Sequence, residues 1–246
     1  MSGAIDLSGK AALVTGATGG IGGAITDALA GAGMALLLTG RDRERLEAAA
    51  GRARGLGAAS VQAWPADLTE DGAAEALADR AVESLGGIDV LVHALGLFAG
   101  GTIADTPLDD LDGQYRVNLR APWALTRALL PALTERRGQV VFVNSSAGLH
   151  PARGSWGAYA ATKHALRAFA DSLRDEVNPA GVRVISIFPG RTATAMQERV
   201  KRFEGRPYDP ERLLQPGDVA AAVLAALTAA RTAEVTDLSV RPMRPG

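Results

Sequence analysis

Short apolar runs alternate with longer amphipathic segments along the whole chain. The segments between the runs are rich in Ala and Leu, and residues 21–32 and 41–54 carry their apolar side chains at helical spacing. Nearly continuous apolar strands joined by crossover helices are typical of a parallel sheet that is covered on both faces. The pattern predicts an α/β fold, a doubly wound parallel sheet of about seven strands with helices on both faces. The expected strands are residues 10–15, 34–39, 60–64, 88–92, 140–144, 182–188 and, more weakly, 238–240.

The pattern continues without a composition break, an internal repeat or a low-complexity linker. We therefore expect residues 1–246 to form a single domain, since α/β sheets of this length commonly do. One segment departs from the regular alternation. Residues 191–212 are polar, contain Pro and Gly, and directly follow an expected strand, so they are a candidate substrate lid.

Composition and charge remove several classes of function. The chain has 26 Lys and Arg against 27 Asp and Glu, so no overall basic field exists to hold a nucleic acid. It has no cysteine, which excludes disulfides, thiol nucleophiles and Cys-ligated metals. The first residues show no basic region followed by an apolar one, and no apolar run is long enough to span a membrane. We expect a cytoplasmic protein without a signal peptide, a membrane span or a catalytic metal.

The 29 glycines cluster near the start of the chain. The sequence Thr-Gly-Ala-Thr-Gly-Gly-Ile-Gly, residues 15–22, lies between the first expected strand and the first helix. Glycines at such a turn allow the backbone to approach a pyrophosphate, and the helix N-terminus supplies free amide donors. Glycine also serves tight packing between strand and helix. The position after the N-terminal strand nevertheless favours phosphate binding.

The end of the second expected strand bears on the kind of dinucleotide. A carboxylate there would bond the ribose 2′-hydroxyl and repel a 2′-phosphate, but the chain has Gly40 and Arg41. Arg41 offers a bidentate phosphate partner and favours NADP over NAD, although it also begins a charged helical segment. Asp67, after the third strand, either faces the adenine or is an N-terminal helix residue.

Tyr159 and Lys163 lie four residues apart in a helical segment, so their side chains emerge from one face. A neighbouring ammonium favours the phenolate, which predicts a lowered pKa for Tyr159 and a role in proton transfer. Such a pair alone is more often ordinary helix packing. Ser145 and Ser146 follow the fifth strand, at the sheet edge where open α/β sheets bind ligands. Asn118 lies in an otherwise amphipathic helical segment. A polar residue there either caps a helix end, hydrogen-bonds the backbone or holds a water molecule.

Together these residues resemble the short-chain dehydrogenase/reductases of the single-domain type, and the resemblance runs from end to end of the chain. It implies a Rossmann-type fold and an NAD(P)(H)-dependent oxidoreductase that transfers hydride between nicotinamide, with NADPH preferred, and a carbonyl or secondary alcohol. The family's tetrad corresponds to Asn118, Ser146, Tyr159 and Lys163, with Ser146 chosen because it lies thirteen residues before Tyr159. The implied cofactor contacts are Gly16, Thr18, Gly19, Ile21, Gly22, Arg41, Asp67, Tyr159, Lys163, Pro189, Gly190, Thr192 and Thr194.

The resemblance also implies roles for these residues. Ser146 would orient the carbonyl, Tyr159 would protonate its oxygen, Lys163 would bind the nicotinamide ribose, and Asn118 would fix a water. Thr192 or Thr194 would lie near the carboxamide or the phosphates. A homodimer or homotetramer, formed through the helices that carry Asn118 and Tyr159, is the implied assembly.

One motif departs from the family pattern. His93-Ala94-Leu95-Gly96 replaces the usual Asn-Asn-Ala-Gly after the fourth strand. His93 either contacts the ribose or, as we favour, is buried and bonded to the backbone. Two other functions stay open, a 3-oxoacyl-acyl-carrier reductase and a dinucleotide sensor without turnover. An apolar, partly aromatic pocket is expected from residues 97–98, 149–156 and the lid.

Overall fold

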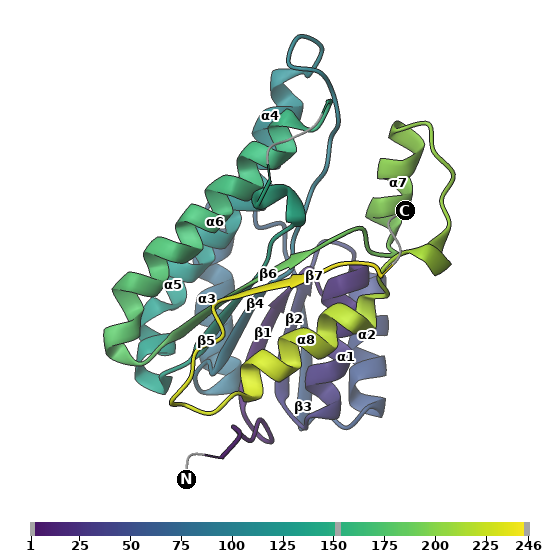
Figure 1. Cartoon of the computed structure of the whole chain (residues 1–246). Helices are drawn as coiled ribbons and strands as arrows, with labels where there is room; N and C mark the ends of the chain where they lie inside the picture. The colour runs from purple at the N-terminus through teal and green to yellow at the C-terminus, as the bar shows by residue number, and fades with distance from the viewer. Residues whose placement is uncertain (1–2, 151–153, 244–246) are drawn as a thin grey trace.

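A seven-stranded parallel sheet forms the centre of the computed structural model, which describes residues 3–150 and 154–243 (Figure 1). The strand order is β3-β2-β1-β4-β5-β6-β7, and every neighbouring pair is parallel. The order reverses between β1 and β4, which is where doubly wound sheets bind their ligands. The strands are β1 (Ala11–Thr15), β2 (Ala35–Gly40), β3 (Ser60–Pro65), β4 (Val90–His93), β5 (Gln139–Val143), β6 (Arg183–Pro189) and β7 (Asp237–Val240).

These strands confirm the predicted fold class, and their bounds fall within two residues of the expected ones. Every residue of β1, β4, β5 and β6 is buried, which explains their mostly apolar character. β7 at the edge alternates between exposed and half-buried residues. Its weaker sequence signal follows from that one-sided burial.

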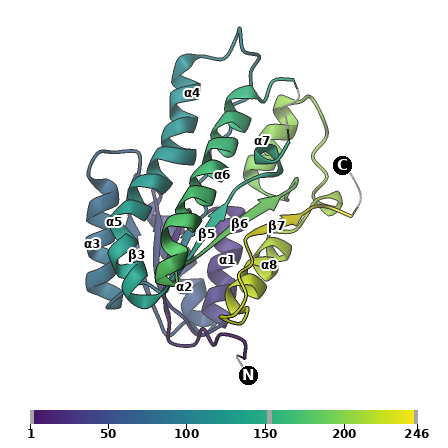
Figure 2. The same cartoon turned by 60° about the vertical axis from the view of Figure 1, so that its left-hand side comes forward.

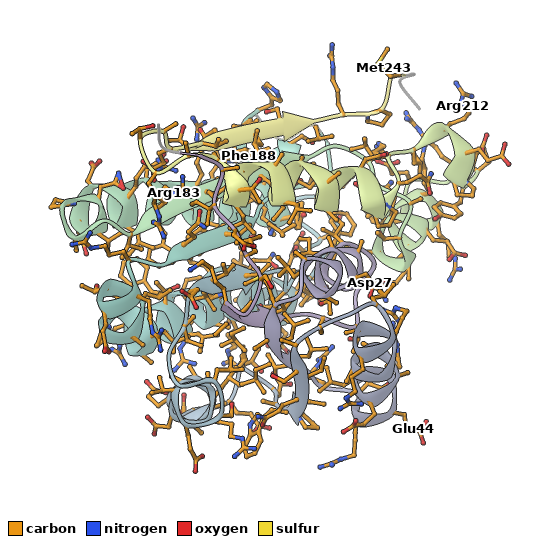
Figure 3. The ribbon with its side chains drawn as sticks, turned by 90° about the horizontal axis from the view of Figure 1, so that it is seen from below. Asp27, Glu44, Arg183, Phe188, Arg212 and Met243 are labelled. Atoms are coloured by element: carbon orange, nitrogen blue, oxygen red, sulfur yellow. The ribbon has the colours of Figure 1, made fainter. Side chains whose placement is uncertain are left out.

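Helices cover both faces of the sheet (Figures 1 and 2). Ile25, Leu46 and Val223 belong to the apolar cluster on one face, where α1, α2 and α8 pack. Leu77 and Leu125 belong to the cluster on the other face, with α3, α5 and α6. Seen from below, side chains fill the space between the sheet and both helical layers (Figure 3). These helices are α1 (Gly20–Gly31), α2 (Arg43–Gly55), α3 (Ala73–Leu85), α5 (Ala121–Arg136), α6 (Gly157–Val177) and α8 (Pro216–Thr228).

Two helical regions extend beyond the carboxyl ends of the strands (Figures 1 and 2). On one side, α4 (Leu108–Tyr115) continues through a π-helical turn (Arg116–Arg120) into α5, next to the first turns of α6. On the other side stands α7 (Ala195–Phe203). Within the described residues, none of the helices combines the length and the apolar character that a membrane crossing requires. α4 and α7 therefore stand on opposite sides of the carboxyl ends of the strands (Figures 1 and 2).

Candidate active site

The carboxyl ends of the strands open into a cavity of about 1030 Å³. It extends from the glycine loop after β1, past the ends of β2, β4, β5 and β6, to α7. Every residue that the sequence suggested as a cofactor contact lines this one cavity, as do Ser145 and Ser146. These residues come from six separate stretches of the chain, so the fold brings together what the sequence could only suggest.

The glycine loop fits a phosphate-bearing ligand. Gly16 has a φ of 66°, and a Cβ there would lie 2.6 Å from the Ala94 carbonyl oxygen. A Cβ at Gly22 would overlap the Gly16 carbonyl. No side chain caps the N-terminus of α1 at Gly19, so the free amides of its first turn remain available beside the cavity. With the positive end of the helix dipole, they suit the pyrophosphate of a dinucleotide.

Two arginines stand at the far end of the cavity. Arg41 is 76% exposed, and its Nη1 lies 3.8 Å from Asp67 Oδ2. Arg45, which the sequence analysis treated only as part of a charged helix, donates from Nη2 to the Thr18 carbonyl at 2.9 Å. Its place in the first turn of α2, just after the end of β2, is the signal that could have identified it. This end of the cavity therefore carries two guanidinium groups and the open position of Gly40.

Asp67 lies in the loop before α3, which begins only at Ala73. Its Oδ1 accepts hydrogen bonds from the Thr69 amide at 3.0 Å and the Thr69 hydroxyl at 2.7 Å. Burial opposes the charged form, but the Thr69 bonds and the Arg41 charge outweigh it and hold the pKa of Asp67 below its ordinary value. Asp67 is therefore a carboxylate of the cavity wall and not a residue of the helix.

Tyr159 and Lys163 are both buried on the first two turns of α6. Lys163 Nζ lies 5.9 Å from the centre of the Tyr159 ring and donates to the Val143 carbonyl at 3.2 Å. Burial lowers the pKa of Lys163 to about 8. Burial also raises the pKa of Tyr159, against a hydrogen bond from Ser145 that lowers it. The expected lowering of the Tyr159 pKa is thus wrong for this structure, because desolvation of the phenolate outweighs the opposing effect of Ser145.

Ser145 is the serine that acts on Tyr159, since its hydroxyl favours the phenolate and works against the rise of the Tyr159 pKa. Ser145 keeps an extended backbone after β5, with φ −162° and ψ 153°, and its Oγ accepts from the Ala147 amide at 3.1 Å. Ser146 already begins a 3₁₀ turn (Ser146–Gly148). The thirteen-residue spacing predicts Ser146 as the serine of the site. Both serines line the cavity, and Ser145, fourteen residues before Tyr159, is the one that affects the Tyr159 pKa.

Asn144 joins this strand end to α6, a role that the sequence analysis did not assign. Its Oδ1 accepts from the Ser145 amide at 2.9 Å, and its Nδ2 donates to the Lys163 carbonyl at 3.2 Å. A Cβ at Gly148 would lie 2.8 Å from both of these acceptor oxygens, so only glycine permits this close approach. A polar residue at the end of a fully buried strand was the available signal.

Asn118 lies in the π-helical turn between α4 and α5 and is completely buried. Its Oδ1 accepts a hydrogen bond from the Leu97 amide at 2.8 Å, and its Nδ2 donates one to the Leu97 carbonyl at 2.9 Å. It also donates to Thr162 Oγ1 at 3.0 Å. The sequence allowed Asn118 to cap a helix, to bond the backbone or to hold a water. The structure shows that it bonds the backbone. Asn118 therefore fixes the loop after β4 against the turn of α6 that carries Lys163, and π-turns of this kind are frequent at functional sites.

Aromatic rings line the cavity next to Tyr159. The Phe98 ring lies 4.8 Å from that of Trp156 and 5.3 Å from that of Tyr159, centre to centre. Leu97, Val117 and Val200 add apolar surface. Residues 151–153 of the expected lining segment 149–156 lie outside the described residues. The described part of this end matches the expected apolar, partly aromatic pocket.

The segment that carries α7 lies against the cavity from the opposite side. Thr194 caps α7 by accepting from the Gln197 amide at 3.2 Å, and a Cβ at Gly20 would lie 2.5 Å from its Cγ2. At the other end of α7, the Phe203 ring occupies the space that a Cβ at Gly100 would need. Thr192, by contrast, donates its hydroxyl to the Gly190 carbonyl at 3.0 Å. Thr194 is therefore the threonine beside the glycine loop.

His93 ends β4 in the core behind the cavity. Its ring stacks on Phe142 at 5.0 Å, its Nε2 is 2.8 Å from Thr126 Oγ1, and its Nδ1 has no partner among the described residues. Burial lowers its pKa to about 3, so the ring is neutral. The favoured interpretation as a buried histidine is correct, but its bond goes to a side chain and not to the backbone.

This burial makes stability depend on pH. The unfolded chain protonates His93 below about pH 6.5 and the folded chain only near 3, so the contribution to stability is full above about 6.5 and lost as the pH falls. When the pH is lowered from about 7.5 to about 5, we expect His93 to reduce the free energy of unfolding by about 2 kcal/mol. Denaturant unfolding of the wild type and of His93→Asn at both pH values measures it. Equal losses in both proteins would contradict the prediction.

The chain is similar to known proteins in sequence and in fold. A family model described as short chain dehydrogenase matches residues 10–205. The chain belongs to this family. Among its oxidoreductase relatives, an uncharacterized oxidoreductase of Staphylococcus aureus strain USA300 is 33% identical over 238 residues, covering 96% of this short-chain dehydrogenase and 99% of that protein.

Two solved structures are similar to this short-chain dehydrogenase over nearly their full lengths. A metagenomic short-chain oxidoreductase in complex with NADP is 30% identical, with a TM-score of 0.83, covering 98% of this chain and all of that one. An NAD⁺-bound xylitol dehydrogenase is 26% identical, with a TM-score of 0.88, covering 97% of this chain and 100% of that one. The family resemblance inferred from the sequence is thereby confirmed.

Proposed function

We propose that this short-chain dehydrogenase reduces a ketone or aldehyde with NADPH, or oxidises the corresponding alcohol, with Tyr159 as the acid and base. The observation that carries the proposal is the buried Tyr159, which shares one cavity with Ser145 and the uncapped N-terminus of α1. A phenol and a hydroxyl at the end of a dinucleotide groove can bind one carbonyl oxygen together.

The cavity fits a nicotinamide dinucleotide, which supplies the hydride when bound. The glycine loop and the first turn of α1 would hold its pyrophosphate, and Asp67 would face its adenine. Arg41 and Arg45 would bind a 2′-phosphate at the end of β2, where no carboxylate opposes it. The NADP complex of the metagenomic relative supports a preference for NADP(H) over NAD(H). The NAD⁺-bound xylitol dehydrogenase indicates that NAD(H) is the alternative cofactor.

The proton step follows from the buried pair. Because burial raises the pKa of Tyr159, its hydroxyl carries a proton at neutral pH and can donate it to the carbonyl oxygen as negative charge develops there. Ser145 would hold that oxygen. Lys163, with a pKa of about 8, is largely cationic at neutral pH and would stabilise the resulting phenolate and bind the nicotinamide ribose. Asn118 and Asn144 hold the backbone around Lys163 through Thr162 and the Lys163 carbonyl.

The direct test follows NADPH and NADH consumption over ketones, aldehydes and 3-oxoacyl thioesters. We expect turnover of at least one carbonyl class, faster with NADPH than with NADH. Preference for 3-oxoacyl thioesters would select the acyl-carrier reductase. Tight binding of NADPH without turnover of any class would contradict the proposal and favour a dinucleotide sensor.

The cofactor preference is tested at Gly40. A Cβ there would lie 3.3 Å from Thr18 Oγ1, so a side chain fits with a small shift. We expect Gly40→Asp to lower the NADPH to NADH ratio of kcat/KM by about 100-fold, because the carboxylate repels a 2′-phosphate and accepts from a 2′-hydroxyl. Gly40→Ala adds the same Cβ without the charge and should leave the ratio nearly unchanged. An unaltered ratio in Gly40→Asp would show that the 2′-phosphate binds elsewhere.

We propose a homodimer or homotetramer, because Leu108, Leu111, Tyr115 and Trp123 expose apolar surface along α4 and α5. Sedimentation at micromolar concentration checks this, and a monomer mass would contradict it. We likewise propose that residues 1–246 act as one domain with residues 191–212 as a lid, supported by the contacts of α7 with the loops around the cavity.

A further inference from the structure

Aromatic side chains are scarce in this chain, but they gather in one place. The sequence contains 5 Phe, 3 Trp and 3 Tyr in 246 residues. Four of these rings meet around Phe98, whose ring centre lies 4.8 Å from that of Trp156, 5.3 Å from that of Tyr159 and 6.0 Å from that of Phe203. We call these four residues the aromatic cluster. They come from the loop after β4, the N-terminus of α6 and the end of α7, so the fold concentrates aromatic surface beside Tyr159.

The rings of the aromatic cluster are packed at steep angles. Phe98 is edge-on to Tyr159 and to Phe203, with interplanar angles of 70° in both pairs, and Trp156 is edge-on to Tyr159 at 81°. Edge-to-face pairs of this kind are a favourable arrangement of aromatic rings. A Cβ at Gly100 would overlap the Phe203 ring, so glycine there lets the end of α7 approach the loop that carries Phe98. The packing therefore fixes the orientation of Phe98 relative to Tyr159.

Phe98 and Trp156 keep part of their surface open to the cavity, since both are half-buried and line it. Other rings of the chain are placed differently. Phe142 on β5 packs edge-on against Phe169 on α6 at 5.4 Å, and neither of them lines the cavity. That contact is explained by packing between a strand and a helix. Half-buried rings next to loops at a cavity wall are instead typical of ligand contacts.

Few polar groups near the aromatic cluster are free to bind hydroxyl groups of a substrate. Among the described residues, the carboxylates that line the cavity are Asp67 and Glu204. Asp67 lies at the far end beside Arg41, and both oxygens of Glu204 accept from Arg191, at 2.8 and 2.6 Å. A polyhydroxylated substrate would bury hydroxyl groups against aromatic rings, and each one left without a partner weakens binding. The site therefore favours an apolar group next to the carbonyl.

We propose that the substrate of this enzyme is a carbonyl compound that carries an aromatic ring, and that Phe98 and Trp156 bind this ring and determine specificity. The carbonyl oxygen lies at Tyr159 and Ser145, and the substrate ring continues the edge-to-face packing of the aromatic cluster. An aromatic ring binds there better than a saturated ring of the same size, because edge-to-face contacts contribute beyond the buried area. This inference rests on the proposed reductase function and deepens it.

The test compares benzylacetone with its cyclohexyl analogue. In both ketones two methylene groups separate the ring from the carbonyl, so the carbonyl carbon is equally reactive and the pair differs in the ring alone. We expect kcat/KM for the phenyl ketone to exceed that for the cyclohexyl ketone by about tenfold, mainly through KM. A ketopentose, which has hydroxyl groups in place of a ring, should be reduced about 100-fold less efficiently than benzylacetone. Equal efficiency with the ketopentose would contradict the proposal.

Two variants assign the preference to the rings. Phe98→Leu and Trp156→Leu should each lower the phenyl-to-cyclohexyl ratio of kcat/KM by about fivefold. The ratio is taken within one variant, so a general loss of activity or stability cancels. Trp64→Leu is the matched control, because Trp64 lies on β3, is 38% exposed and does not line the cavity. It should keep the wild-type ratio.

Calorimetry gives a readout without turnover. It uses the primary amides that correspond to the two ketones, which carry the same rings but are not reduced, in the presence of NADP. Tighter binding of the phenyl amide that is lost in Phe98→Leu, with no ketone reduced, would leave the aromatic site standing and contradict the reductase function. Equal turnover of the phenyl and cyclohexyl ketones, with the ratio unchanged in both variants, would overturn the aromatic site and leave the reductase intact.

Discussion

Tyr159→Phe is expected to lower kcat for carbonyl reduction by about a thousandfold while leaving the affinity for NADPH nearly unchanged. The substitution removes one hydroxyl from a buried ring whose packing against Phe98 and Trp156 stays the same. That hydroxyl is the only proton donor that we assign to the carbonyl oxygen. Its loss therefore affects the transition state and not the binding of the cofactor.

Steady-state kinetics and NADPH fluorescence titration together measure this prediction. Tyr115→Phe is the matched control, because Tyr115 ends α4 with 48% of its surface exposed and does not line the cavity. The control should keep wild-type kcat. If Tyr159→Phe retained most of its activity, the proton would have to come from another group. If it lost NADPH binding as well, the ring would have a structural role that we have not assigned.

The second large effect separates the two adjacent serines. We expect Ser145→Ala to lower kcat by about 100-fold, since it removes the hydroxyl that favours the Tyr159 phenolate and would hold the carbonyl oxygen. Ser146→Ala, at the start of the 3₁₀ turn, should change kcat by less than about threefold. The two variants differ by one position and remove the same atom. The reverse order of effects would restore Ser146 and the thirteen-residue spacing.

The sequence predicted most of the fold because its strands are buried on both faces. Nearly continuous apolar runs such as β5 and β6, separated by helical segments, indicate buried parallel strands. The glycine loop and the pair Tyr159 and Lys163 were also predictable, because both depend on spacing within one local element. These features need no knowledge of how distant segments pack.

What the sequence did not predict depends on contacts between such segments. The choice between Ser145 and Ser146 depends on where the chain leaves its extended course after β5, and spacing to Tyr159 does not fix that point. The direction of the Tyr159 pKa depends on how deeply both partners are buried.

The lid segment, residues 191–212, shows the same limit. The sequence shows an excess of basic residues over 191–212, and we could read that excess as a solvated surface. Only the packed α7 shows that Lys201 is buried while Arg202 is exposed. Arg206, after the turn at Gly205, is exposed and lines the cavity.

The central claim is hydride transfer from NADPH to a carbonyl carbon at Tyr159. The measurement that tests it most directly uses NADPH deuterated at the transferable position of the nicotinamide, with mass spectrometry of the alcohol formed from each carbonyl class. We predict deuterium on the carbinol carbon in the wild type and none in Tyr159→Phe over the same time. Saturating binding of the deuterated cofactor, with no deuterium transferred to any carbonyl, would contradict the account.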